Sequence, residues 1–210
     1  MIAESVLIEK VRTLLNEAHG EGGLSLITDD SLMLENYIKE LLPEAVLFVQ
    51  MNKGNGAVNG KSTAECNLVL SNEDKGIIAL PKDYVKLISL KLDIWKKPCY
   101  ATAEPDSVIE RAQMNRYMRA GVLSPVCVES TTTEGVQLCV YPVKSDNAPS
   151  VEYLIYEAQY DGNNGLATNN CQLIQAVAYQ CAGLVCNVFE KYDAANAFMS
   201  LAAALCNNKK

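Results

Sequence analysis

Helical periodicity at the two ends of the chain, with strand-like alternation only between them, is the feature that most limits the fold. In residues 2–19 the apolar side chains recur every three or four positions, which is typical of an amphipathic helix. Residues 84–95 alternate between apolar and polar side chains, which is typical of a half-buried strand. Helices and strands do not alternate along the chain, so the sequence argues against a doubly wound parallel sheet.

Three further helices are expected in the end segments. One follows the capping residues Asp29 and Asp30, and Pro43 is expected to kink or divide it because proline cannot donate to the helical hydrogen-bond ladder. The other two cover residues 170–189 and the stretch from Ala194 to Leu205. The apolar faces of the first two helices are formed by Leu7, Val11, Leu14, Leu15 and Ala18, and by Leu34, Ile38, Leu41, Leu42 and Ala45.

The middle of the chain predicts short strands around one helix. Ser107 and Glu110 match a capping box that would open a helix over 107–120. Strands are expected at 68–70, 77–80, 84–95, 125–130, 135–141 and 150–157. The fold class is therefore α+β, a helical bundle built from the N- and C-terminal helices with an inserted antiparallel β-rich subdomain. Its expected boundaries are 1–51 (helices), 52–63 (flexible loop), 64–160 (β-rich subdomain with one short helix) and 161–210 (helices).

Composition and charge exclude several classes of protein. Apolar residues make up 49% of the 210 residues, which argues against intrinsic disorder. Eighteen Lys and Arg against 25 Asp and Glu give a net charge of −7, and no dense basic cluster exists to bind nucleic-acid phosphates. No apolar run approaches the roughly 20 residues that span a bilayer, and the early Glu4 argues against a secretory signal. We expect no membrane association.

The eight cysteines do not form a recognisable metal or redox motif. They include no C-x-x-C pair, and the single histidine, His19, lies beside a helix-ending glycine. We therefore expect buried free thiols that act as small apolar residues, and no catalytic, metal-binding or cofactor-binding residues.

Gly60-Lys61-Ser62 is the one segment that approaches a nucleotide-binding motif. A phosphate loop requires a glycine at position 55, where this chain has Asn55, and it requires a helix after Ser62, where the sequence indicates loop and strand. Residues 46–49 would have to form the preceding strand. A P-loop-like nucleotide-binding protein stays an alternative, as does an unrelated protein–protein adaptor.

A set of strand motifs resembles one family. Residues 80–92 (LPKDYVKLISLKL) and 95–98 (WKKP) are followed by 136–142 (VQLCVYP) and 151–156 (VEYLIY). This order of motifs resembles the head–tail connector proteins, or tail adaptors, of short-tailed phages. The cysteine and asparagine content is similar to that of ring proteins from crAss-like phages.

The resemblance implies an architectural role. Twelve copies of the family's proteins form a ring below the portal, join the capsid vertex to the tail and continue the DNA channel. It implies four kinds of partner: other copies of the chain, the portal protein, tail or further ring proteins, and genomic DNA that passes without sequence-specific binding. The location would be the neck of the virion, assembled in the cytoplasm of the bacterial host. The net charge adds the hypothesis that acidic side chains face the channel.

Three surfaces are candidates for contacts in such a ring. They are the loop 52–63, expected to become ordered on contact with a partner, the segment from Tyr84 to Lys97, and the helix 170–189. The candidate interface residues are Lys53, Asn55, Lys61, Tyr84, Trp95, Lys96, Lys97, Ile174 and Tyr179.

Overall fold

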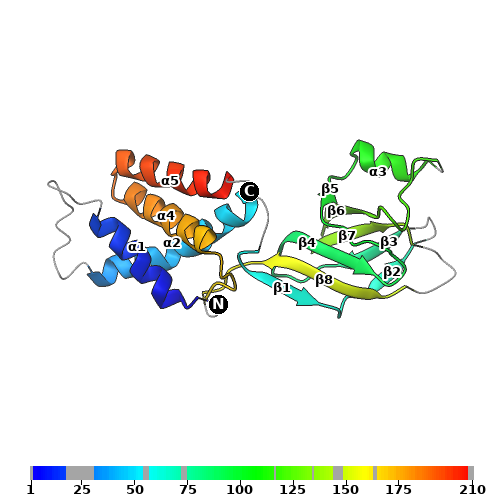
Figure 1. The fold of residues 1–210 in the computed structure, drawn as a ribbon, viewed down its shortest axis with the longest axis horizontal. Helices are drawn as coiled ribbons and strands as arrows, with labels where there is room; N and C mark the ends of the chain where they lie inside the picture. The colour runs from blue at the N-terminus through cyan, green and yellow to red at the C-terminus, as the bar shows by residue number, and fades with distance from the viewer. Residues whose placement is uncertain are drawn as a thin grey trace. The chain divides into compact units, whose positions relative to one another are not determined.

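The computed structural model divides the chain into two compact units (Figure 1). The helical unit combines Met1–Asn59 with Gln159–Lys210, and the β unit is Gly60–Ala158. The predicted fold class is confirmed: helices from both ends pack together, and β-sheets are inserted between them. The structure describes residues 2–17, 31–53, 57–71, 75–115, 117–133, 135–143, 149–162 and 165–207.

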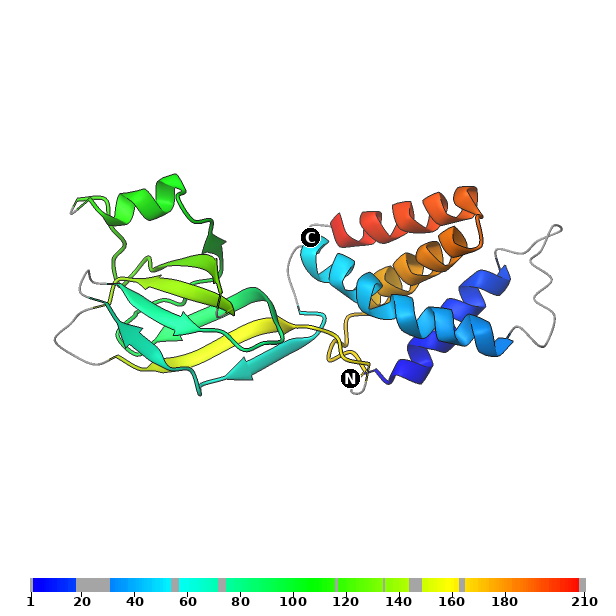
Figure 2. The ribbon, with the colours of Figure 1, turned by 180° about the vertical axis from the view of Figure 1, so that it is seen from behind.

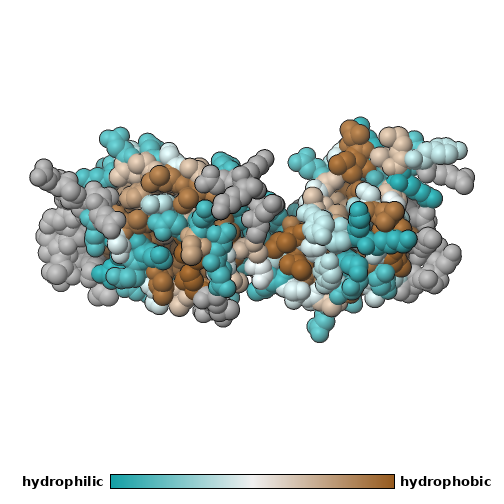
Figure 3. Space-filling view, in the orientation of Figure 1, coloured by the Kyte–Doolittle hydropathy of each residue, from teal (hydrophilic) through white to brown (hydrophobic). Residues whose placement is uncertain are grey.

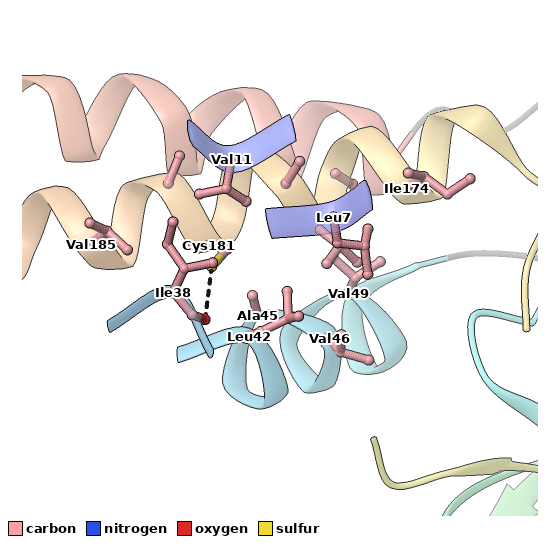
Figure 4. Packing of buried hydrophobic residues seen from close by; sticks show 14 of the residues in the cluster. Leu7, Val11, Ile38, Leu42, Ala45, Val46, Val49, Ile174, Cys181 and Val185 are labelled. Atoms are coloured by element: carbon pink, nitrogen blue, oxygen red, sulfur yellow. Dashed lines mark hydrogen bonds between the residues drawn. The ribbon is translucent and has the colours of Figure 1, made fainter. Parts of the chain in front are cut away.

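The described residues of the helical unit form four helices. They are α1 (Glu4–Glu17), α2 (Ser31–Asn52), α4 (Cys171–Val188) and α5 (Tyr192–Asn207). The most apolar of them, α4, packs against the other three. Figure 4 shows the core, where Leu7 and Val11 of α1 lie with Ile38 and Leu42 of α2 and with Cys181 of α4. The expected apolar stripes are therefore the ones that hold this unit together.

The second helix differs from its prediction at Pro43. The structure has one helix through Ser31–Asn52 with Pro43 inside it, so of the two expected outcomes, a kink or a division, the division is wrong. Proline removes one backbone donor, but Leu42, Ala45 and Val46 on the same helix are fully buried. The burial of these side chains offsets the lost hydrogen bond. His19, Gly20, Asp29 and Asp30 lie outside the described residues.

The contact between α4 and α5 depends on small residues. A Cβ atom added at Gly183 would come within 2.8 Å of Met199 Cγ and 3.2 Å of the Ala195 carbonyl oxygen. Ala195 and Ala202 of α5 are fully buried. The alanines and the glycine thus let the two helix backbones approach closely, as the Ala-rich sequence of α5 indicates.

Two sheets form the β unit. The first has the order β1-β8-β4, and all its strands are antiparallel. The second has the order β2-β3-β7-β6-β5, and its one parallel pair is β5 with β6. The strands are β1 (Gly60–Thr63), β2 (Leu68–Leu70), β3 (Gly76–Ala79), β4 (Tyr84–Leu92), β5 (Thr102–Ala103), β6 (Val126–Thr132), β7 (Gly135–Tyr141) and β8 (Val151–Ala158).

The two sheets share one core. Leu90 and Leu154 from the first sheet lie in the same buried cluster as Leu138 and Val140 from the second. Trp95 belongs to this cluster and its indole N–H donates a hydrogen bond to the Pro142 carbonyl oxygen at 2.9 Å. The β unit is therefore a sandwich whose largest side chain is anchored through its polar atom.

The first and last strands of the β unit are neighbours. Gly60 and Glu157 are paired in the antiparallel ladder of β1 and β8, which Figure 2 shows side by side. The last four residues of the expected loop 52–63 are thus a strand, because each of them has a pairing partner on β8. Residues 54–56 of that loop lie outside the described residues.

Candidate interaction surface

The chain between β5 and β6 forms a projecting segment, which we call the α3 arm (residues 104–125). It contains α3 (Val108–Gln113), seen beyond β5 and β6 in Figure 1. Before the arm, Thr102 and Ala103 pair with Cys127 and Val128. Near the other end, the backbone N–H of Lys96 donates to the Val122 carbonyl oxygen at 2.9 Å. Both ends of the arm are therefore attached to the sheets.

Local hydrogen bonds determine the length of α3. The Ser107 hydroxyl accepts from the Glu110 N–H, as the capping box predicts, while the Glu110 carboxylate accepts from the Asp106 N–H at 2.8 Å. After Gln113, the Asn115 side chain accepts from the Tyr117 N–H at 3.0 Å. Such a turn competes with helical hydrogen bonding. The predicted helix over 107–120 is thus too long.

The arm exposes an unusual amount of apolar surface. None of the residues of α3 is buried. Seven of the sixteen large apolar side chains that are exposed in the described chain lie in or beside the arm, and Tyr117 is 93% exposed. They are Tyr100, Val108, Ile109, Met114, Tyr117, Met118 and Leu123. Figure 3 shows brown, apolar atoms near α3. Concentrated exposed apolar surface marks sites of interaction.

The arm has an internal frame as well as its attachments. The Gln113 side chain donates to the Ile109 carbonyl oxygen at 2.7 Å and accepts from the Ala120 N–H at 2.8 Å. Ala120, together with Ala103 and Val126, packs on Val128, Cys139 and Tyr141 on the outer face of the five-stranded sheet. The exposed apolar side chains are thus presented on a hydrogen-bonded support.

An open pocket of about 610 Å³ lies beside the arm. Its walls come from residues 97–103, from Ile109 and from residues 123–127. The lining is mainly apolar and includes Pro98, Tyr100 and Leu123. A pocket of this kind can receive an apolar side chain from a partner.

The helical unit has exposed apolar residues of its own. Leu47 and Met51 lie one turn apart on α2, and Val188 and Tyr192 flank the turn between α4 and α5. Leu201 is exposed on α5. Each unit therefore offers apolar surface to a partner.

Three of the nine candidate interface residues are buried within their own units. Trp95 is 2% exposed and fills the sandwich core, while Ile174 is 4% exposed and lies in the helical core. Lys53 is also buried. Their side chains are used within their own units, so they do not form an exposed surface.

The other three candidate lysines differ in their exposure and in their partners. Lys96 and Lys97 are exposed, and Lys97 lines the pocket beside the α3 arm. Lys61 is half-exposed, and its Nζ lies 2.6 Å from Asp83 Oδ2. The other Asp83 oxygen accepts from the Tyr156 hydroxyl at 3.1 Å. Lys61 is therefore engaged in a polar cluster within the β unit.

The remaining candidates are half-buried or undescribed. The Tyr84 hydroxyl donates to Glu129 Oε2 at 2.8 Å, and burial together with this carboxylate raises the pKa of Tyr84. The Tyr179 ring stacks on Phe198 with centroids 6.0 Å apart. Asn55 lies outside the described residues.

The sequence did not predict the α3 arm as an exposed apolar surface. Its signal is a short predicted helix whose apolar residues, among them Val108, Ile109 and Met114, do not fall on a single face. A helix of that pattern cannot bury all its apolar side chains against one sheet.

The segment around Gly60-Lys61-Ser62 lacks the geometry of a phosphate loop. Residues 46–49 belong to α2, and Gly60–Thr63 is strand β1. A phosphate loop needs the reverse order, a strand before it and the N-terminus of a helix after it. The backbone of Lys61 and Ser62 is instead paired with β8.

Six of the eight cysteines are buried, as expected for small apolar residues, while Cys66 is half-buried and Cys171 is exposed. Over the described parts of the chain, no three His, Cys, Asp or Glu side chains come together to hold a metal ion.

One described helix, α4, is long and apolar enough to cross a membrane. Eleven of its residues are buried in the helical unit, which is also the pattern of a central helix in a water-soluble bundle.

Comparison of the sequence with protein-family models and with curated proteins finds no match.

Proposed function

We propose that this protein is a structural subunit of a phage virion, a head–tail connector that forms a ring below the portal and continues the DNA channel. The observation that carries the proposal is the α3 arm. Its apolar side chains, Tyr117 and Val108 among them, are held outward on a hydrogen-bonded frame. A ring subunit buries such surface against its neighbour. The family resemblance of residues 80–98 and 136–142 supports the same role.

Ring assembly requires two different surfaces on each copy. A head-to-tail interface joins one patch to another and closes when the rotation between copies closes. The α3 arm with its pocket is one apolar surface in the β unit, and α2 and α5 carry exposed apolar side chains in the helical unit. The chain thus has the surfaces that this kind of interface needs.

The charge of the chain suits a channel that DNA passes without binding. The net charge is −7, and Lys61, one of the basic residues, is paired with Asp83. An acidic wall repels DNA phosphates and prevents the duplex from sticking during ejection. A reconstruction of the assembled ring with a strongly basic bore would contradict this part of the proposal.

The proposal is tested by imaging the protein alone and with the portal protein of the same virus. Native mass spectrometry and negative-stain microscopy should show a ring, with twelve copies by family resemblance, on the portal. A protein that stays monomeric with the portal present overturns the proposal. A monomer without the portal does not, since the proposal places assembly on the portal as a template.

A substitution in the arm sharpens the test. Tyr117→Glu places a charge on the most exposed apolar side chain of the arm and should abolish or strongly reduce ring formation. Thr131→Glu adds the same charge at an exposed position of β6 and should leave assembly unchanged. Equal assembly of the two variants would show that the arm is not an interface.

The two alternatives give different results in these experiments. An unrelated protein–protein adaptor would bury the same arm but would not assemble on the portal. A nucleotide-binding protein would release or absorb heat when titrated with ATP or GTP in a calorimeter. We expect no heat of binding, because β1 occupies the position where a phosphate loop needs a helix.

A further inference from the structure

Two of the eight thiols contact each other in the β unit. Cys99 and Cys127 belong to the same buried cluster, and each thiol shifts the pKa of the other. Cys127 is 1% exposed and Cys99 is 7% exposed. Both residues line the pocket of about 610 Å³ beside the α3 arm. A small molecule that enters this pocket therefore comes close to the thiol pair.

The backbone places the two cysteines on different sheets. Cys99 exchanges two hydrogen bonds with Leu90 of β4, at 2.8 and 2.9 Å, so it is fixed to the three-stranded sheet. Cys127 belongs to β6, where it pairs with Val140 on β7 and Thr102 on β5. A bond between the two sulfur atoms would join the two layers of the sandwich.

The environment gives the two thiols different chemistry. Hydrogen bonding from Cys127 and from the backbone outweighs burial and lowers the pKa of Cys99 to about 6. Hydrogen bonding to Cys99 and burial raise the pKa of Cys127. In the protonated form, the Cys99 thiol donates a hydrogen bond to the Ala101 carbonyl oxygen at 3.1 Å, which fixes the position of the sulfur. Cys99 is thus suited to be the attacking thiolate and Cys127 the thiol that resolves the product.

We propose that Cys99 and Cys127 are an oxidisable dithiol that a hydroperoxide converts to a disulfide between the two sheets. The Cys99 thiolate attacks the peroxide O–O bond and forms a sulfenic acid, and hydroxide leaves. The Cys127 sulfur then attacks the Cys99 sulfur, the S–S bond forms, and the sulfenic oxygen leaves as water with the Cys127 proton. The two thiols lose two electrons, and hydrogen peroxide is reduced to two molecules of water.

The disulfide would act on the segment that carries the α3 arm. Cys99 and Cys127 lie at the two ends of that segment, before Tyr100 and after Val126. The bond would close residues 100–126 into a covalent loop and would restrict the unfolded state of the β unit. The inference does not depend on ring assembly, because it concerns a pair of thiols within one chain.

The first test is oxidation of the folded protein with hydrogen peroxide. After denaturation, free thiols are blocked with N-ethylmaleimide and the tryptic peptides are analysed by mass spectrometry. We expect peptides joined through Cys99 and Cys127, with a mass two hydrogens below the sum of the reduced forms. Cys127→Ser should instead leave a sulfenic acid at Cys99 that dimedone traps, and Cys99→Ser should give neither product.

Cys171→Ser is the matched control. It removes an exposed thiol outside the pair and should leave the Cys99–Cys127 disulfide unchanged. Oxidation that leaves both Cys99 and Cys127 reduced, or that joins either of them mainly to another cysteine, overturns the proposal.

A second test requires no oxidant and therefore does not depend on disulfide formation. The rate of Cys99 alkylation by iodoacetamide is measured as a function of pH in the folded protein. Its midpoint should lie near pH 6 and should move upward in Cys127→Ala, because this variant lacks the side-chain donor that favours the Cys99 thiolate. A midpoint above 8 in the wild type, or one that the substitution does not move, contradicts the assigned roles.

Discussion

The helical unit and the β unit are held together in different ways. The helical core is one cluster of buried side chains, and the buried small residues Ala195, Ala202 and Gly183 allow close helix contacts. The β unit encloses large side chains whose polar atoms need partners, such as the Trp95 N–H and the Tyr84 hydroxyl. The first unit therefore depends on small residues at one interface, and the second on hydrogen-bonded aromatic anchors. A substitution in one core should therefore lower the stability of its own unit more than that of the other unit.

The largest effect is expected for Trp95→Ala. The change leaves a cavity in the sandwich core and removes the donor to the Pro142 carbonyl oxygen. The free energy of unfolding of the β unit should fall by about 3–5 kcal/mol, measured by chemical denaturation. Trp95→Phe keeps most of the ring volume and should lose less. Amide exchange should rise in the β unit, and an equal rise in the helical unit would contradict separate cores.

Gly183→Ala should have an intermediate effect in the helical unit. The new methyl group would meet Met199 Cγ at 2.8 Å, and overpacking destabilises by about 1–3 kcal/mol. Alanine regains up to about 1 kcal/mol through its higher helix propensity. The net loss should be about 1 kcal/mol. Gly121→Ala is the control, because a Cβ atom there meets nothing within 4 Å. If Gly183→Ala left the free energy of unfolding unchanged or raised it, α4 and α5 would have room for the added methyl group.

The smallest effect concerns Asp83. Burial favours its neutral form, but hydrogen bonds from Lys61 and Tyr156 outweigh burial, so the pKa of Asp83 is lowered. A lowered pKa in the folded state means that the carboxylate stabilises the β unit above the unfolded pKa. This contribution disappears as the pH falls through the folded pKa. For a partly exposed pair it should be below about 1 kcal/mol.

The measurement for Asp83 is the stability of the β unit between pH 7 and pH 2. Asp83→Asn should lower stability at pH 7 and reduce the loss on acidification. A variant with an unchanged acid profile would show that Asp83 has the same pKa in both states. Lys91 and Glu152, a second exposed pair on the same sheet, provide the comparison through Glu152→Gln.

Periodicity predicted the helices and strands well because local side-chain patterns reflect burial. Leu7, Val11 and Leu15 lie on the buried face of α1 as expected. The sequence predicts that Pro43 kinks or divides α2, and the helix is not divided, because tertiary packing of the neighbouring residues outweighs one missing hydrogen bond. Local rules therefore identify the elements better than they identify their ends or interruptions.

The candidate surface could be predicted only in part. Trp95 beside two lysines is a candidate interface residue from the sequence, yet its ring completes a core formed by strands far away in the sequence. Lys97 is also a candidate from the sequence, and it lines the pocket. The α3 arm and the contact of Cys99 with Cys127 depend on how β4, β5 and β6 are arranged in space. No local pattern encodes such an arrangement.

The pairing of β1 with β8 has a consequence for how this chain can be altered. The β unit begins at Gly60 and ends at Ala158, and Gly60 lies opposite Glu157 in one ladder. The flanking Asn59 side chain donates a hydrogen bond to the Gln159 carbonyl oxygen at 3.3 Å. The two ends of the β unit, at Gly60 and Ala158, are therefore neighbours in space. A single genetic deletion or exchange between them would remove or replace a whole module, and a short linker would rejoin the helices.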